Sequence, residues 1–154
     1  NALKRVIKAP RMYFLDTGLC AHMMGWGSAA VLENSSMSGA FFGTWVVSEI
    51  YKSYLNAGKR PPLYFYRDSN KKEIDVILYQ NGTVYPIEIK KSTAPKNAIK
   101  NFSVLSPITE EPEDDVFSGA AHLKTEIGTG AVVCLATDIL PIDKKNWYVP
   151  AWII

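Results

Sequence analysis

Hydrophobic and polar residues alternate through residues 73–80 and again through 83–90. A period of two predicts a pair of strands, and the Asn81-Gly82 dipeptide between them predicts a two-residue hairpin turn. The short aromatic stretch at 63–67 predicts a further strand. Three consecutive strands joined by tight turns indicate an antiparallel meander.

Helical spacing appears on both sides of this meander. Residues 39–56 predict a helix that ends near Gly58. One stripe of that helix carries Phe42, Trp45, Val46, Glu49, Ile50 and Ser53. Ile99, Phe102 and Leu105 predict a second amphipathic helix of about three turns within residues 94–105.

The remaining segments complete an α/β pattern. We expect a strand at 11–15, a turn or helix start at 16–19, loops at 25–38 and 106–127, a buried strand at 130–136 and a last strand at 146–154, interrupted at Pro150. This order predicts one domain with a central mixed β-sheet flanked by α-helices.

Composition places the chain among globular proteins. It has 154 residues, of which 47% are hydrophobic, enough for the core of one domain. No apolar run approaches the ~20 residues of a membrane helix, and Cys20 and Cys134 lack metal or redox spacing. We therefore expect a cytoplasmic protein with no membrane segment.

The chain begins Asn-Ala without methionine, so we expect residues 1–2 to be a tag remnant and residues 3–154 to be the C-terminal part of a longer protein. Net charge is +2, and the run at 110–115 holds five of the 15 acidic residues. Outside that run 17 basic residues face 10 acidic ones, a balance of +7. This balance is compatible with a polyanionic partner, and equally with an ordinary solvated surface.

The hairpin register places Asp75 opposite Glu88 and Glu73 opposite Lys90. Two directly opposed carboxylates cost roughly 0.2–1 kcal/mol on an exposed sheet. A divalent cation between them would remove that cost, and Mg²⁺ prefers carboxylate and carbonyl oxygens. The alternative is a surface ion-pair cluster with the neighbouring lysines, which contributes little to stability.

Asp75, the triplet Glu88-Ile89-Lys90 and the helical Glu49 together resemble the PD-(D/E)xK constellation. The resemblance implies a restriction-endonuclease-like fold. It also implies that Asp75, Glu88, the Ile89 carbonyl and Glu49 hold Mg²⁺ or Mn²⁺, while Lys90 orients or activates the attacking water. Ile74 stands where the pattern has proline, and no Gln and Tyr pair follows Lys90 as in the RecB-like branch.

A closer resemblance covers nearly the whole chain, carried by the stretches RMYFLDTGL, GAFFGTWVVSEIYK, LYFYRDSNKKEIDVIL, YPIEIKKS and NWYVPAWII. These look like one uncharacterised prokaryotic domain of the same nuclease-like superfamily. That domain typically follows an AAA-type ATPase module, so the resemblance implies an upstream ATPase in the same polypeptide.

The leading hypothesis is a Mg²⁺-dependent nuclease with Asp75, Glu88, Lys90 and Glu49 as catalytic residues. Candidate nucleic-acid contacts are Lys59, Arg60, Arg67, Lys71, Lys72, Lys91 and Lys96. A catalytically inactive docking module of the ATPase, for nucleic acid or protein, and a structural oligomerisation piece remain as alternatives. The sequence contains no Gly-rich phosphate loop, so we expect no ATP site in this part of the protein. His22 and His122 have no further metal-ligand residues at a suitable spacing, so we expect no zinc site.

Overall fold

The computed structural model describes residues 10–105 and 125–154. Its strands are β1 (Leu63–Arg67), β2 (Glu73–Gln80), β3 (Thr83–Ile89), β4 (Glu126–Ile127), β5 (Gly130–Cys134), β6 (Leu140–Pro141) and β7 (Asn146–Pro150). Its helices are α1 (Thr17–Met23), α2 (Ala29–Asn34) and α3 (Ser38–Asn56), with 3₁₀ turns η2 (Lys100–Val104) and η3 (Ala151–Ile153).

The strands of the described ranges form one seven-stranded sheet in the order β1-β2-β3-β5-β7-β6, with β4 paired to β3. The pairs β1–β2 and β2–β3 are antiparallel, as the predicted meander requires. The pairs β3–β5 and β5–β7 are parallel. The prediction of a mixed sheet flanked by helices is therefore confirmed.

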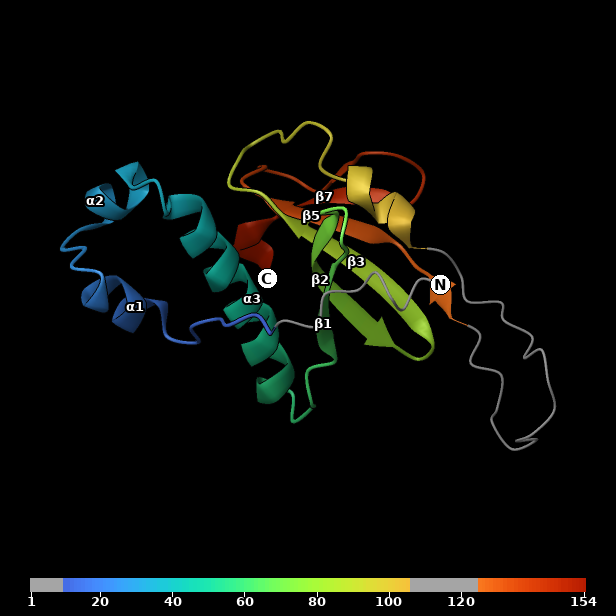
Figure 1. Cartoon of the computed structure of the whole chain (residues 1–154), viewed down its shortest axis with the longest axis horizontal. Helices are drawn as coiled ribbons and strands as arrows, with labels where there is room; N and C mark the ends of the chain where they lie inside the picture. Colours follow the sequence, from blue (N-terminus) through green and yellow to red (C-terminus); the bar gives the residue numbers. More distant parts are fainter. Residues whose placement is uncertain (1–9, 106–124) are drawn as a thin grey trace.

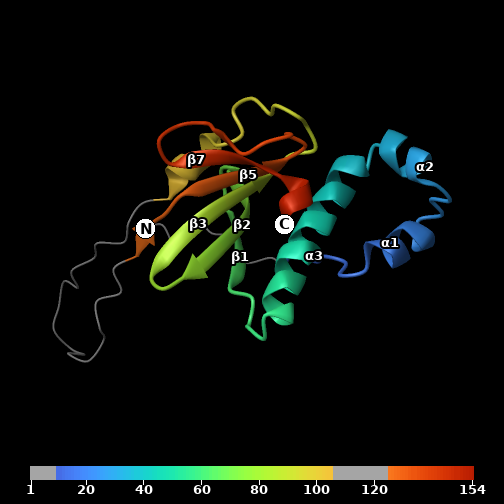
Figure 2. The same ribbon diagram turned by 180° about the vertical axis from the view of Figure 1, so that it is seen from behind.

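Helix α3 covers one face of the sheet, as Figures 1 and 2 show. Its buried stripe packs against β2, β3 and β5 in one core cluster of Val46, Val47, Ile50, Val76, Ile89, Val133 and Ala151. Burying each of the larger side chains contributes roughly 1.5–3 kcal/mol. Gly58, at φ 68°, lies just beyond the helix end and adopts the left-handed conformation that glycine favours.

The segment 95–105 packs on the other face, where Ala98 lies in a cluster with Val132, Cys134 and Ala136. The predicted three-turn helix at 94–105 is wrong. Asn97 has a φ of 55°, which a continuing α-helix cannot contain, and only the 3₁₀ turn η2 follows it. This compact turn still brings a second layer onto the sheet.

The segment before α3 differs from its prediction in two places. Residues 11–15 form no strand, and α2 occupies part of the expected loop at 25–38. The predicted turn or helix start at 16–19 is confirmed, because Asp16 caps α1 by accepting the Leu19 N–H at 2.8 Å. Ser28 caps α2 in the same way, through the Val31 N–H.

Neither α1 nor α2 contains a buried residue. Both lie beyond α3, away from the sheet (Figure 1). No helix in the described ranges combines the length and apolar character that crossing a membrane requires. The predicted tag remnant, the acidic run at 110–115 and His122 lie outside the described residues.

Candidate functional site

The β2–β3 hairpin is regular near its turn. Asn81 and Gly82 both have positive φ angles, 51° and 78°, as a two-residue type I′ turn requires. The ladder runs in the predicted register from Gln80–Thr83 to Val76–Ile87. The register that the sequence predicts is confirmed over this length.

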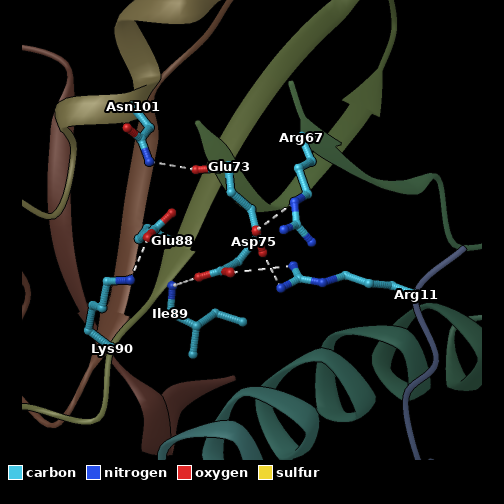
Figure 3. A network of polar contacts seen from close by, with 8 residues as sticks. All are labelled: Arg11, Arg67, Glu73, Asp75, Glu88, Ile89, Lys90 and Asn101. Carbon is cyan, nitrogen blue, oxygen red and sulfur yellow. Dashed lines mark hydrogen bonds and ion pairs between the residues drawn. The ribbon is translucent and has the colours of Figure 1, made fainter. Parts of the chain in front are cut away.

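The ladder does not continue to the acidic pairs. Asp75 and Glu88, which were predicted to pair directly, lie just beyond its last pair. Instead the Ile89 N–H donates a hydrogen bond to Asp75 Oδ2 at 3.0 Å. The carboxylate therefore takes the place of a strand carbonyl and lies between the two strands at their open end (Figure 3).

Glu88 is buried beside Asp75, with 6% of the residue exposed. Its Oε1 accepts from Lys90 Nζ at 2.6 Å. Its Oε2 is the only buried side-chain nitrogen or oxygen without a hydrogen-bond partner in the part of the chain that the structure describes. Such an oxygen is costly to leave unpaired, so this atom is suited to accept an additional partner.

Burial raises the pKa of Glu88, and the negative charge of Asp75 raises it further, while the Lys90 ammonium opposes both. Burial alone would lower the pKa of Lys90. The hydrogen bond and charge of Glu88 outweigh that effect, so the pKa of Lys90 is raised. Lys90 is therefore an ammonium at neutral pH and acts as a hydrogen-bond donor.

Arg11 reaches the same cluster from the segment before α1. Its guanidinium forms an ion pair with Glu73, and its Nη1 lies 3.5 Å from Asp75 Oδ1. The guanidinium carbon also lies 5.6 Å from the centre of the Phe65 ring, within cation–π range. Figure 3 shows this side chain directed at Asp75 from the side opposite Lys90.

A polar cavity of about 500 Å³ opens over these carboxylates. Asn101 of η2 donates to the Glu73 carbonyl at 2.8 Å, which fixes η2 against β2 at the cavity wall. The charged and amide side chains around the cavity are Glu73, Asp75, Glu88, Lys90, Lys96, Asn97, Lys100 and Asn101. The cavity thus combines the buried carboxylate of Glu88 and the half-buried carboxylates of Glu73 and Asp75 with three lysines.

The structure brings Asp75, Glu88, Ile89 and Lys90 together, as predicted, but does not bring Glu49 to them. Glu49 pairs with Lys52 one turn further along α3. Several α3 residues line cavities together with Asp75, and Val47 lines both of these cavities. At about 100° per residue, Glu49 lies roughly on the opposite side of the helix from Val47.

The predicted nucleic-acid contacts are spread over the surface. Lys96 lines the polar cavity, and Arg67 Nε lies 3.8 Å from Glu73 Oε2. Lys91 is engaged by Glu33 of α2 at 2.9 Å. The remaining four, exposed in the loop before β1 and the turn between β1 and β2, are Lys59, Arg60, Lys71 and Lys72.

Sequence reasoning missed Arg11, Lys100 and Asn101. Lys100 and Asn101 follow Lys96 in a segment whose spacing predicts an ordinary amphipathic helix. Arg11 lies 64 residues before Asp75, and no spacing rule connects them. Only the folded chain brings this arginine to the acidic cluster.

The donor atoms fit a hard divalent cation. In the ranges that the structure describes, no three of His, Cys, Asp and Glu gather closely enough to hold a metal alone. Mg²⁺ commonly uses one or two carboxylates and keeps several waters. The unpaired Glu88 Oε2 and the adjacent Asp75 supply such a pair, although Arg11 competes for Asp75.

Ile89 adds a third oxygen. Its N–H points to Asp75, whereas the Lys90 N–H points to β5 and bonds the Val133 carbonyl. In an extended strand the N–H and C=O of one residue face the same neighbour. The Ile89 carbonyl therefore faces the open end of the hairpin with Asp75, as the predicted metal site requires.

A family model described as "Domain of unknown function (DUF4143)" matches residues 38–154. Two curated relatives, uncharacterized protein Mb2031c of Mycobacterium bovis and uncharacterized protein Rv2008c of Mycobacterium tuberculosis, are each 30% identical over 95 residues. The match covers 62% of this chain and 21% of either relative, so it spans about a fifth of their length. No solved structure matches the chain significantly.

Proposed function

Because this chain belongs to the DUF4143 family, whose description assigns no activity, we propose a function from its site: metal-dependent cleavage of phosphodiester bonds in nucleic acid. The observation that carries the proposal is the buried Glu88, which has one oxygen on Lys90 and the other unpaired, next to Asp75. The proposal includes a restriction-endonuclease-like fold, supported by the order of helix, antiparallel meander and parallel strands.

The metal ligands would be the carboxylates of Asp75 and Glu88 and the carbonyl of Ile89. A bound Mg²⁺ or Mn²⁺ would supply a water of lowered pKa and positive charge beside the scissile phosphate. The Ile89 N–H holds Asp75 in place through its 3.0 Å hydrogen bond. This contact orients the carboxylate in the way that outer hydrogen bonds orient metal ligands.

Lys90 donates to the attacking water or to a phosphate oxygen. Its raised pKa argues against a general base, because an ammonium has no lone pair with which to accept a proton. Its role is to orient the nucleophile and to stabilise developing negative charge. Lys96 and Lys100 border the same cavity and supply further positive charge for the phosphate backbone.

Cleavage assays test the proposal. Purified protein is incubated with plasmid, single-stranded DNA and RNA in Mg²⁺, Mn²⁺ or EDTA. Asp75→Asn keeps an acceptor for the Ile89 N–H but loses the charge, and we expect at least a hundredfold loss of metal-dependent cleavage. Lys90→Ala should lower the rate by about 10²–10³, the effect of losing one donor that stabilises developing charge.

Glu49→Gln is the matched control, because it also removes one carboxylate charge but lies away from the cluster. It should cleave like the wild type. Cleavage that survives Asp75→Asn unchanged would remove the proposal.

A docking module of an upstream AAA-type ATPase is the second candidate. The observation that favours it is Arg11, which neutralises Glu73 and Asp75 within the chain, so that no metal is needed for charge balance. Titration calorimetry with Mn²⁺ distinguishes a metal-dependent nuclease from a docking module. Heat that disappears in Asp75→Asn favours the enzyme, and absence of binding favours the docking module.

A further inference from the structure

A second cavity, of about 380 Å³, lies between α3, β1 and the segment before α1. Most of its wall is apolar, and its aromatic side chains are Tyr13, Tyr51, Tyr64 and Phe65. Arg11 and Asp75 also line it. Asp75 borders the polar cavity as well, so the aromatic cavity and the proposed catalytic site meet at this residue.

The aromatic rings are not simply part of the core. Tyr64 is 61% exposed and Tyr51 is half-buried. Tyr13 and Phe65 are also half-buried, with Tyr13 partly against the core and Phe65 beneath the Arg11 guanidinium. Rings that remain accessible around a hollow offer flat faces to a planar ligand. Aromatic side chains of this kind stack with nucleobases without sequence preference.

The charged residues near the cavity and its volume restrict the class of ligand further. The exposed Lys59 and Arg60 directly precede Pro61 of the wall and can contact a phosphate. The volume lies near the lower end of the range for small-molecule sites. It therefore suits one base with its sugar and excludes a base pair.

We propose that this aromatic cavity takes one unpaired base of the strand whose phosphodiester lies at Asp75, Glu88 and Lys90. The inference rests on the proposed function and names its substrate class as single-stranded nucleic acid. A base within a duplex would have to leave its stack and its partner before it could enter. Base occupancy then positions the adjacent phosphate at the carboxylates.

Fluorescence anisotropy tests the inference. Three labelled ligands are compared in Ca²⁺, to suppress cleavage: a single-stranded oligothymidylate, the corresponding duplex and an abasic strand of equal charge. We expect the single strand to bind about tenfold more tightly than the other two, the size of one stacked base. Tyr64→Ala should abolish this preference and Tyr64→Phe should retain it.

The control is Trp152→Ala, since Trp152 is an aromatic residue 71% exposed and outside the cavity wall. It should bind all three ligands like the wild type. Equal binding of the three ligands, or an unchanged preference in Tyr64→Ala, would overturn the inference. If cleavage still depended on Asp75, the proposed function would stand without the base site. Conversely, a base preference without any cleavage would remove the proposed function and leave the base site standing.

Discussion

Residues 38–105 with 125–154, which we call the body, and residues 10–37, the N-terminal segment, are held in different ways. In the body, α3 buries four residues, including Val46 and Ile50, against the sheet. In the segment, α1 and α2 bury none. The segment contacts the body through ion pairs, from Arg11 to Glu73 and Asp75 and from Glu33 to Lys91. Its apolar contacts are only partly buried, with Tyr13 against the core cluster and Trp26 edge-on to Phe41.

The proposed catalytic site is built from both parts of the chain. The carboxylates belong to the body, within the residues that the family model matches, whereas Arg11 comes from outside the match. Regions with few buried apolar contacts are those that open at low free-energy cost. The cation that neutralises Asp75 is therefore carried by the part of the chain that has fewer buried apolar contacts.

The largest expected effect is on the free energy of unfolding, which a truncation in the body should lower far more than a truncation in the segment. Ile74→Ala, at a fully buried position of β2, should lower the free energy of unfolding by about 3 kcal/mol through lost burial and a cavity. Leu19→Ala in α1, where the residue is 51% exposed, should change it by less than about 0.5 kcal/mol. Urea denaturation measures both, and similar losses would show that the segment is part of the core.

Arg11→Gln tests whether the segment restrains the site. Removing the competing guanidinium should tighten Mn²⁺ binding about two- to fivefold, the worth of a partly exposed ion pair. Calorimetry measures the dissociation constant, with Arg60→Gln as an exposed control of equal charge change. Weaker Mn²⁺ binding in Arg11→Gln would mean that Arg11 supports the carboxylates rather than competing for them.

The free energy of unfolding should change with pH because of the protonation of Glu88. Burial raises the pKa of Glu88 in the folded state above its ordinary value of 4.5. At pH values just above 4.5, Glu88 therefore holds its proton more often in the folded state than in the unfolded state. Stability from this group therefore falls as the pH rises. Denaturation in EDTA at several pH values should show the wild type losing stability relative to Glu88→Gln as the pH increases, and the reverse trend would contradict the assignment.

The smallest effect concerns the contact between α2 and the body. Glu33 is 67% exposed at its side chain, so Glu33→Gln should cost about 0.5 kcal/mol or less of global stability. Hydrogen exchange of the α2 amides should nevertheless become faster, because Lys91 no longer holds the helix. Unchanged exchange in α2 would show that other contacts fix it.

The regular body could be largely predicted from sequence, because its signals are local. The Asn81-Gly82 turn and the alternation of β2 and β3 fix the register without reference to any other strand. The apolar run of β5 likewise marks a buried strand. Helix α3 follows from its own periodicity and from Gly58.

The predictions that failed depend on tertiary context. Residues 11–15 have strand-like composition but no strand partner, and their position is set by the distant contact of Arg11 with Asp75. The left-handed Asn97 interrupts a segment with helical spacing. The end of the hairpin ladder at Val76 could not be predicted from alternation, because the side chain of Asp75 there replaces a backbone acceptor.

Because the Ile89 amide donates to Asp75 Oδ2, its proton senses the charge and position of that carboxylate. A single backbone resonance in a ¹H–¹⁵N spectrum can thus report on the site with no substrate present. Its chemical shift should move when an ion draws electron density from Asp75. Broadening confined to that signal would instead reveal two exchanging orientations of one side chain.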